Sequence, residues 1–360
     1  MENTFEYVGH LHIHTSFSDG SGSVEEVAEA ARKAGLDFIG ITDHNTLGGK
    51  HRGLEGLHYG VLVLFGVELN NEKNHYLAFN VEEEIPPNTA NPQEVIDAVN
   101  AQGGFGYLAH PVEKSNPFVM EGKSFEWTAW DVEGFTGLEI WNFGSQWRLA
   151  FKNRLTALFW YYVNTYYPSR FPDEEGLQKW DELNKKRLVL GFGGSDAHNF
   201  PARLGPVRIV LFPYEFLFRT INTHVVLQEE LDADFARAKR QLFTALKSGH
   251  FFTASDYLKP ARGFRFYAFD ENSSEQPVHM SGEIPHSPST ALHVTSPFSR
   301  CLIRLIKDGE VVNETKKQYF GFKVLAPGSF RAEVYWRSPR GKLYPWIYSN
   351  PIRVIPQKKI

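Results

Sequence analysis

Residues 8–15 read Val-Gly-His-Leu-His-Ile-His-Thr, and this stretch sets the interpretation of the whole chain. Its histidines alternate with apolar residues, which is the period of a β-strand, where successive side chains point to opposite faces. His12 and His14 therefore share one face of the expected strand, and two imidazoles at this spacing can chelate one metal ion. A surface strand can also carry two solvated histidines, so the pattern needs support from the rest of the chain.

The segments after this strand alternate between helix and strand signals. Ser23 begins a capping box with Glu26, and Gly35 closes the helix that follows. Asn91 with Pro92 opens a second helix. Short apolar runs predict strands over residues 36–41, 61–67, 75–81, 105–109, 137–141, 188–192 and 207–212. This alternation predicts an α/β domain with mostly parallel strands that is closed, or nearly closed, as a barrel.

The pattern changes after about Pro260. Helical periodicity disappears, and short β-rich runs recur between turn signals, with Asp308-Gly309 as a hairpin turn. These features predict a β-sandwich of roughly 100 residues. We therefore expect two domains, a metal-binding β/α barrel over residues 1–258 and a β-sandwich over residues 259–360.

Composition narrows the class of protein. Of the 360 residues 42% are hydrophobic, and the net charge is -4 with no strongly basic segment, so an extended nucleic-acid partner is not expected. No apolar run approaches the ~18 residues of a membrane span, and the N-terminus lacks the apolar core of a secretory signal. The expected location is therefore cytoplasmic, with no membrane partner. The sequence leaves the oligomeric state open.

The chain has a single cysteine, Cys301. It excludes intramolecular disulfides and clusters of thiolate metal ligands, so any metal must be held by imidazole and carboxylate groups. We interpret Cys301 itself as a small buried hydrophobic residue.

Polar residues in or beside the apolar runs form a set that suits metal binding. Active sites of β/α barrels are built at the C-terminal ends of the strands, so these side chains are expected to meet there. Each one alone is as readily an isolated polar strand end, but together they are too many for one ion. They predict two or three divalent ions of zinc, manganese or iron, which nitrogen and oxygen ligands do not distinguish. Glu68 ends a buried strand, where an unpaired carboxylate is costly, and is the expected bridge between ions. The nine candidate ligands are His12, His14, Asp19, His44, Glu68, His75, His110, Asp196 and His198.

In their number and order these motifs resemble the PHP family (polymerase and histidinol phosphatase). The resemblance implies a distorted seven-stranded β/α barrel, similar to that of amidohydrolases. It also implies that the nine positions bind two or three metal ions and that the substrate is a phosphoester, as in many members. The chain departs from the family at His10, where Asp is usual, so His10 is interpreted as a hydrogen-bond partner rather than as a ligand. The matching segments are residues 10–15, 18–20, 42–45, 66–68, 75, 109–111 and 194–198.

The C-terminal part resembles one branch of the same family. Residues 246–253 read Leu-Lys-Ser-Gly-His-Phe-Phe-Thr, and the β-rich region that follows them ends in Ser-Asn-Pro-Ile at residues 349–352. Both features resemble a two-domain branch that includes phosphoesterases and at least one type that cleaves carbamate esters. The resemblance therefore does not fix the substrate.

The sequence thus predicts an enzyme, a metal-dependent hydrolase. The first interpretation is a phosphoesterase that hydrolyses a small phosphorylated molecule through a metal-bridging hydroxide. The alternative is a metal-dependent hydrolase of a non-phosphate ester, carbamate or amide. A binding module that keeps metals for structure is disfavoured, because structural metal sites seldom need nine ligands.

Other candidates surround the expected metal site. Asp43 is predicted to orient His44 or to transfer protons, and a capping role is equally compatible with its position. Arg203 is predicted to bind a phosphate oxygen and act in catalysis, and Lys114 to bind phosphate as a point charge, although both residue types are also common on solvated surfaces. An aromatic group either lines a substrate pocket or belongs to the core, and it consists of Trp127, Trp130, Trp141 and Trp147.

Overall fold

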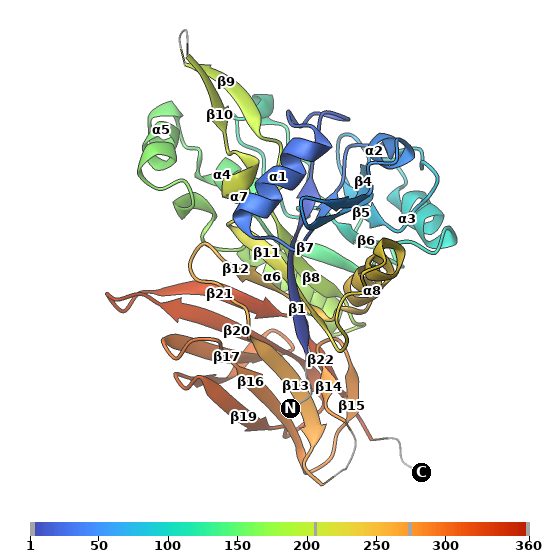
Figure 1. Cartoon of the computed structure of the whole chain (residues 1–360). Coiled ribbons are helices and arrows are strands. Elements are labelled where there is room, and N and C mark those ends of the chain that lie inside the picture. The colour runs from blue at the N-terminus through green and yellow to red at the C-terminus, as the bar shows by residue number, and fades with distance from the viewer. Residues whose placement is uncertain (1–3, 205–206, 273–275, 358–360) are drawn as a thin grey trace.

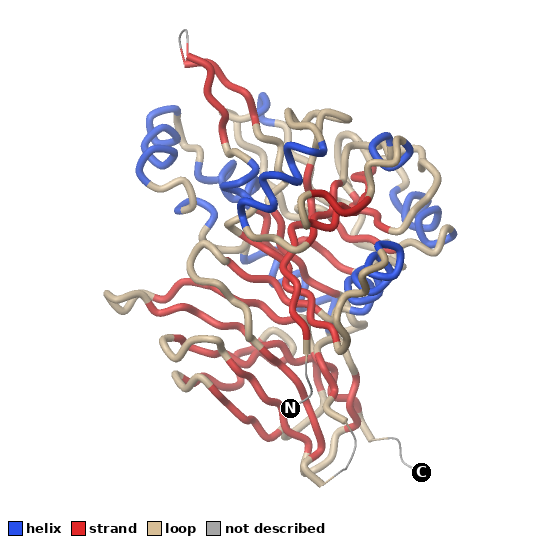
Figure 2. The backbone as a smooth tube through the Cα atoms, in the orientation of Figure 1, coloured by secondary structure: helices blue, strands red, loops and turns tan. Residues whose placement is uncertain are grey.

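The computed structural model describes residues 4–204, 207–272 and 276–357, without the side chains of residues 120, 154, 203, 204, 207 and 208. Its fold is mixed α/β, as the sequence predicts. Figure 1 shows that the helices gather around the strands of the N-terminal part, while the C-terminal strands form sheets below it. Figure 2 shows strands in both parts but helices only around the upper one. No helix within the described ranges is both long and apolar enough to cross a bilayer.

Seven neighbouring strands form the frame of the N-terminal part. In spatial order they are β1 (Phe5–Ile13), β2 (Phe38–Ile41), β4 (Val61–Leu69), β5 (Tyr76–Phe79), β6 (Phe105–Leu108), β7 (Gly137–Asn142) and β8 (Leu190–Gly194). Neighbours in this series are parallel except at β5, which is antiparallel to both β4 and β6.

The series curves back on itself. After β8, the His14 amide donates to the Ala197 carbonyl at 2.9 Å, and the Ala197 amide donates to the His12 carbonyl at 3.1 Å. The end of the series is therefore hydrogen-bonded to its beginning, an arrangement consistent with the expected distorted barrel of seven strands.

Helices pack against both faces of this frame. The α1 helix begins as the sequence predicts, because the Ser23 hydroxyl accepts from the Glu26 amide and the Glu26 carboxylate accepts from the Ser23 amide. Gly35 ends the helix with a left-handed φ of 81°. The helices of this part are α1 (Val24–Ala34), α2 (Gly48–His51), α3 (Pro92–Ala101), α4 (Phe143–Ala150), α5 (Arg154–Val163), α6 (Glu174–Asn184), α7 (Tyr214–Leu217) and α8 (Phe235–Ser248), with single 3-10 turns η1 (Met120–Gly122) and η2 (Tyr167–Ser169) and a short strand β3 (Gly56–His58).

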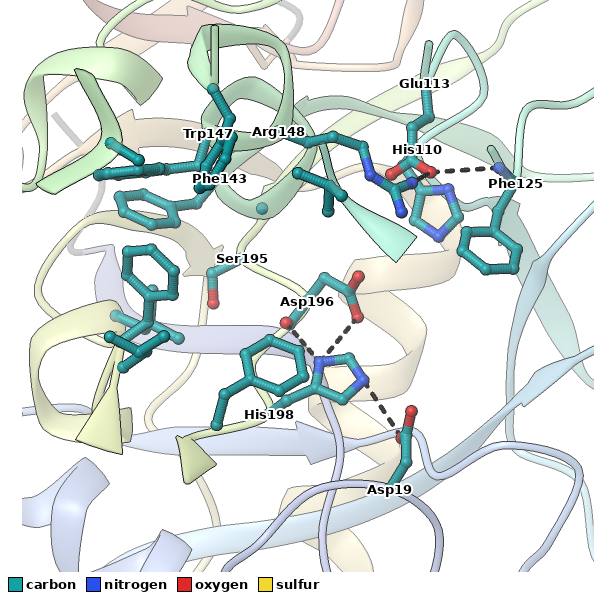
Figure 3. Close-up of a pocket in the computed structure, with 18 of the residues that line it drawn as sticks. Asp19, His110, Glu113, Phe125, Phe143, Trp147, Arg148, Ser195, Asp196 and His198 are labelled. Atoms are coloured by element: carbon teal, nitrogen blue, oxygen red, sulfur yellow. Dashed lines mark hydrogen bonds and ion pairs between the residues drawn. The ribbon is translucent and has the colours of Figure 1, made fainter. Parts of the chain in front are cut away.

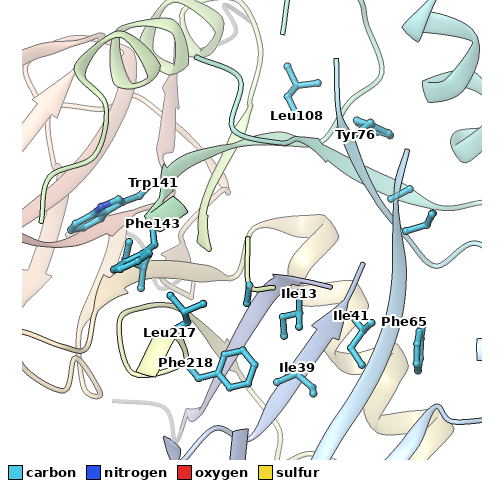
Figure 4. Close-up of a cluster of buried hydrophobic side chains, with 14 of the residues drawn as sticks. Ile13, Ile39, Ile41, Phe65, Tyr76, Leu108, Trp141, Phe143, Leu217 and Phe218 are labelled. Carbon is cyan, nitrogen blue, oxygen red and sulfur yellow. The ribbon is translucent and has the colours of Figure 1, made fainter. Parts of the chain in front are cut away.

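Alternate strand positions pack into two apolar clusters. Ile39 lies in one cluster with residues of α1 and α3, whereas its neighbour Phe38 lies in the other with Leu242 and Leu246 of α8. Figure 4 shows part of the first cluster, in which Ile39 lies near Phe218. This alternation leaves the strand ends free to carry polar side chains.

Two segments differ from the sequence-based expectation. Residues 207–212 do contain a strand, β10 (Val207–Leu211), but it pairs with β9 (Phe200–Leu204) in a hairpin outside the main sheet. Figure 1 shows this hairpin projecting from the top of the molecule. On its other side β1 instead pairs with β11 (Ile221–Leu227), which pairs in turn with β12 (Phe251–Ser255), and both pairings are antiparallel.

The C-terminal strands form two sheets around a common apolar cluster. One sheet has the order β14-β13-β16-β19, and the other contains β15, β22, β20, β21, β17 and β18. Phe266 and Leu292 of the first sheet and Ile303 and Val334 of the second share this cluster. The strands are β13 (Arg265–Asp270), β14 (Val278–His279), β15 (Glu283–Pro285), β16 (Thr290–Thr295), β17 (Cys301–Lys307), β18 (Glu310–Thr315), β19 (Tyr319–Lys323), β20 (Gly328–Arg337), β21 (Leu343–Ser349) and β22 (Ile352–Ile355).

Two local predictions for this region are confirmed. Asp308 and Gly309 have φ values of 50° and 93° at the turn between β17 and β18, as a two-residue hairpin with positive φ at both positions requires. Cys301 is buried as a free thiol.

The two parts are joined by more than the connecting loop. β12 pairs antiparallel with β21, so one sheet path runs from the C-terminal strands into the barrel strands. Arg331 of β20 forms buried ion pairs with Asp181 of α6 and with Glu333. A domain boundary after residue 258 falls in the loop between β12 and β13, and we retain it as a proposal.

Candidate metal centre

The topology explains why nine scattered residues meet. Most of these residues lie at or just after the end of a strand. They are His12 and His14 at β1, His44 at β2, Glu68 at β4, His110 at β6, and Asp196 and His198 at β8. His75 precedes its strand instead, but β5 runs antiparallel to β4, so the beginning of β5 lies at the same edge. Asp19 reaches the same place from the loop after β1, where its Oδ1 lies 3.2 Å from His198 Nε2.

Glu68 lies at the centre of the cluster and is fully buried. Its Oε1 lies 2.7 Å from His75 Nδ1 and 3.2 Å from His110 Nε2. Its Oε2 lies 3.1 Å from His12 Nε2, 3.0 Å from His14 Nε2 and 3.5 Å from His44 Nδ1. The two oxygens thus face two different groups of imidazoles.

Two further carboxylates complete the cluster. Asp196 Oδ1 lies 3.2 Å from His12 Nε2, 3.0 Å from His14 Nε2 and 3.5 Å from His198 Nδ1. Asp19 Oδ1 lies 3.7 Å from both His14 Nδ1 and His44 Nε2, in addition to its contact with His198.

The potential ligand atoms fall into three overlapping groups. In each group, atoms from different residues all lie within 4.8 Å of one another. His110 belongs to none of the three, although its Nε2 contacts Glu68. The groups are His14, Asp19, His44 and His198; His12, His14, Glu68 and Asp196; and His44, Glu68 and His75.

The polar atoms of the cluster are incompletely satisfied by the protein. Both nitrogens of His14, Nε2 of His75, Nδ1 of His110 and Oδ1 of Asp196 are buried and make no hydrogen bond of suitable geometry, although His14 Nε2 and Asp196 Oδ1 lie 3.0 Å apart. Buried polar atoms normally have a partner, so a group of them aimed at one place indicates a missing one. Imidazole nitrogens and carboxylate oxygens are the donors that transition-metal ions prefer, and the residues therefore fit a metal centre.

Charge interactions in the cluster are strong. Burial lowers the pKa of His14, but Asp196 and Glu68 beside it outweigh burial and raise the pKa to about 10. For His44 burial dominates and lowers the pKa to about 4. Burial raises the pKa of Glu68, but the histidines around it, His12 first, bring the pKa well below its usual range. These buried carboxylates thus stay ionised only with positive charge beside them, which protonated imidazoles or metal ions can supply.

Glu139 of β7 is a functional candidate that the sequence reading missed. It is buried, and it accepts hydrogen bonds from His12 Nδ1 at 3.2 Å and from the His110 amide at 2.9 Å. Its partner His12 has a left-handed φ of 75°. A carboxylate on one nitrogen of a histidine directs the other nitrogen toward a metal. The sequence does carry one signal for Glu139, because it is a single charged residue inside an apolar run. A buried carboxylate is costly unless it has a partner.

His10 lies outside the cluster although it shares a strand with His12. Its Nε2 is hydrogen-bonded to the Ser195 hydroxyl at 2.7 Å, and its Nδ1 to Asn222 Oδ1 at 3.0 Å. Both ring nitrogens are thus occupied, and His10 supports the backbone beside Asp196.

The remaining predicted residues do not meet at the cluster. Asp43 accepts from the Thr15 amide at 2.7 Å and from the hydroxyls of Thr15 and Ser18 at 2.6 Å, so it holds the loop that carries Asp19. Lys114 forms an ion pair with Glu175 at 3.0 Å and does not line the cavity at the cluster. Arg203 belongs to β9, and its side chain lies outside the described part of the structure, so its role stays a prediction.

A cavity of about 920 Å³ opens onto the cluster. Figure 3 shows Asp196 and His198 at its base, Phe143 and Trp147 along one wall, and Glu113 with Arg148 near His110. Of the four tryptophans considered above, only Trp147 lines this cavity, whereas Trp127 and Trp141 are buried in the core. Arg148 and Glu113 carried no signal in the sequence, since their pairing depends on a contact between distant segments.

Comparison with known proteins shows which family the segment with most of these residues resembles. A model of the PHP domain family matches residues 10–127, a segment that contains seven of the nine clustered residues. This match identifies a PHP domain in the N-terminal part of the chain. The chain is 34% identical over 114 residues to an uncharacterised protein of Methanocaldococcus jannaschii, covering 28% of the chain and 66% of that protein.

Two other similarities concern named proteins. The chain is 36% identical over 83 residues to a phosphoribosyl 1,2-cyclic phosphate 1,2-diphosphodiesterase of Eggerthella lenta, covering 21% of the chain and 32% of that enzyme. The matched segments thus span less than two thirds of these relatives. Among solved structures, a two-domain protein of Bacteroides vulgatus with a predicted PHP-like metal-dependent phosphoesterase is similar at a TM-score of 0.47 and 16% identity, over 96% of this chain and 95% of that chain.

Proposed function

We propose that this protein is a metal-dependent phosphoesterase whose centre holds two or three divalent ions. The observation that carries the proposal is the position of Glu68, whose two oxygens face two separate groups of imidazoles. A carboxylate placed in this way suits a bridge between two ions. The PHP domain match over residues 10–127 and the phosphodiesterase name of the Eggerthella lenta relative support hydrolysis of a phosphate ester.

The three overlapping groups of ligand atoms suggest how the ions would be shared among eight of the nine residues. His14 belongs to two groups, and so do His44 and Glu68, so these three would join neighbouring ions. Zinc, manganese and iron all accept this donor set. When bound, such ions supply a Lewis acid and lower the pKa of water toward neutrality, which makes hydroxide available for attack.

The chain's own residues prepare the centre. Glu139 fixes the ring of His12 with Nδ1 protonated, so that Nε2 presents its lone pair toward Glu68 and Asp196. Asp43 fixes the loop before Asp19 through three hydrogen bonds. The walls of the cavity surround the exposed side of the cluster and reduce the access of bulk water to it.

The first experiment measures metal content. Wild-type protein loaded with zinc, manganese or iron and then desalted is expected to keep two or three equivalents per chain. His12→Ala and Glu68→Ala should keep fewer, and chelation should abolish ester hydrolysis until metal is restored. The control is His51→Ala, since His51 is exposed and its ring is hydrogen-bonded to the Glu82 carbonyl, away from the cluster. A wild-type stoichiometry near zero after loading would overturn the proposal.

The second experiment identifies the bond that is cleaved. Metal-loaded protein is tested on p-nitrophenyl phosphate monoesters and diesters beside aryl carbamates and carboxylic esters of the same leaving group. Turnover of a phosphate ester is expected. If only the carbamates or carboxylic esters are hydrolysed, the phosphoesterase assignment fails and the alternative hydrolase function takes its place.

A further inference from the structure

The cavity at the metal centre has two kinds of wall. One end is formed by the clustered histidines and carboxylates. The opposite side is apolar and comes from α4, α5, the segment between them and the end of the β9–β10 hairpin. It includes Phe143, Trp147, Phe151, Leu158, Tyr161 and Phe212. We refer to this side as the apolar wall. Figure 3 shows Phe143 and Trp147 on it, across from His110.

The charges around the cavity are already matched. Arg148 is the only lysine or arginine among the described side chains that line it. Its guanidinium is paired with the buried Glu113 carboxylate, which also accepts from the Ser145 hydroxyl at 2.8 Å and the Phe125 amide at 3.1 Å. The metal centre would therefore bind one anionic group, and the described wall offers no unpaired cation for a second one.

The cavity is larger than a small phosphorylated sugar requires and reaches the surface. A volume of about 920 Å³ lies near the upper end of ordinary ligand pockets, which span about 300–1,000 Å³. Three apolar or aromatic side chains that line the cavity are also exposed to solvent: Leu158 and Phe200 are each 45% exposed, and Tyr162 is 64% exposed. The apolar wall thus continues to the mouth of the cavity, where an unoccupied surface of this kind would contact water at a cost.

We propose that the substrate carries a large apolar group, an alkyl chain or an aromatic system larger than one ring, and that the apolar wall binds this group while the ester lies at the metal centre. This inference rests on the proposed phosphoesterase function for the position of the scissile bond. The apolar preference itself is a property of the wall and can be measured by binding alone.

A series of phosphodiesters with one constant leaving group tests the preference. In methyl, butyl and octyl p-nitrophenyl phosphate, water adds its oxygen to phosphorus, the bond to p-nitrophenolate breaks, and the alkyl phosphate monoester and a proton are released. The kcat/KM of metal-loaded protein should rise by about tenfold for every two methylene groups that the wall buries. A value that stays flat or falls from methyl to octyl overturns the inference.

Two positions of α5 supply a matched pair of variants. Leu158 lines the cavity, whereas Leu155 on the same helix is 80% exposed and does not line it. Leu158→Asp should reduce the ratio of octyl to methyl kcat/KM by about tenfold or more, because the charge must be desolvated next to the chain. Leu155→Asp should leave the ratio unchanged. Equal ratios in both variants and in wild type would overturn the role of the wall.

A binding measurement separates this inference from the proposed function. Methylphosphonate and octylphosphonate, which are not hydrolysed, are titrated into metal-loaded protein below the micelle concentration of the octyl compound, with tryptophan fluorescence or heat as the signal. Tighter binding of octylphosphonate without hydrolysis of any phosphate ester would refute the phosphoesterase function and uphold the apolar wall. Hydrolysis with equal binding of the two phosphonates would uphold the function and refute the wall.

Discussion

Glu139 determines how its neighbour His12 can act. The imidazole of His12 lies between Glu139 on its Nδ1 side and Glu68 with Asp196 on its Nε2 side. Burial lowers the pKa of His12, but Glu68 and then Glu139 and Asp196 raise it well above the usual range. A divalent ion at Nε2 would displace the proton there, while the proton on Nδ1 would stay with Glu139.

Glu139→Gln tests this positioning role. The amide keeps the shape of the side chain but removes the charge that fixes the Nδ1 proton, so metal affinity should fall roughly 10–100-fold. The measurement is calorimetric titration of metal into metal-stripped protein. Glu133→Gln, at an exposed position near the start of the same strand, is the control. An affinity equal to that of wild type would show that Glu139 does not orient His12.

Much of the site could be predicted residue by residue, and the exceptions have a physical reason. The nine clustered residues were recognisable because strand ends are expected to converge at one edge of a barrel. Glu139 was hidden because it lies within its strand, and its role depends on a contact with His12, which is distant in the sequence. Asp43 was assigned to the chemistry from its neighbour His44, yet its hydrogen bonds go to the loop of Thr15 and Ser18. Chain adjacency did not predict side-chain direction there.

At the scale of elements, the end of β1 is distorted where the site requires it. The pairing of β1 with β2 shifts register between Leu11 and Ile13, at the residue with the left-handed φ, His12. β8 approaches this bulge closely because it carries Gly194. An added Cβ at Gly194 would lie 2.7 Å from the Leu11 carbonyl oxygen, 2.7 Å from Glu139 Oε1 and 3.3 Å from the Cβ of His12.

Gly194→Ala is therefore expected to lower metal affinity more than it lowers the stability of the fold. The new methyl group must displace Glu139 or the bulge, which costs about 1–3 kcal/mol of unfolding free energy and turns His12 away from the other ligands. Metal affinity and thermal unfolding are measured together. Ile303→Val, which trims a buried residue of the C-terminal cluster, is a control that should lower stability with no effect on metal binding. Normal metal affinity in Gly194→Ala would refute the argument from close approach.

Elements with strong local signals were predictable, and those held by distant contacts were not. The α1 helix carries its own capping residues, and Asp308-Gly309 fixes its hairpin by turn geometry. β11 was missed because its first half, Asn222 to His224, is polar yet buried. Asn222 and His224 are satisfied by partners elsewhere in the chain, including His10 and Asp256. The apolar run of β10 is a strand, but nothing local shows that it leaves the main sheet.

At the scale of the whole molecule, a buried ionic cluster lies where barrel strands meet the C-terminal part. His224 of β11 contacts Glu6 of β1 at 2.8 Å and Asp256, just after β12, at 3.0 Å. Arg265 of β13 contacts the other oxygen of Glu6 at 2.7 Å. Burial lowers the pKa of His224, but Asp256 and Glu6 outweigh it and raise the pKa to about 9.

This cluster predicts a dependence of stability on pH. Because the folded-state pKa of His224 lies above its ordinary value, the stabilisation is complete below about pH 6.5 and is lost as the pH rises through about 9. Its size is on the order of 3 kcal/mol. The difference in unfolding free energy between wild type and His224→Gln should be largest at pH 6 and shrink toward pH 10, whereas His51→Gln should show no such trend. A difference that is constant with pH would contradict the assignment.

The pairing of β12 with β21 has a consequence for biosynthesis. During translation β12 emerges from the ribosome before β21, so its edge in the nascent N-terminal part stays unpaired on the order of seconds. An unpaired edge beside apolar residues such as Phe252 and Ala254 is a template for association with other chains. Nascent chains should therefore need chaperone protection during this interval, and a gene fragment that stops before β21 should yield insoluble protein.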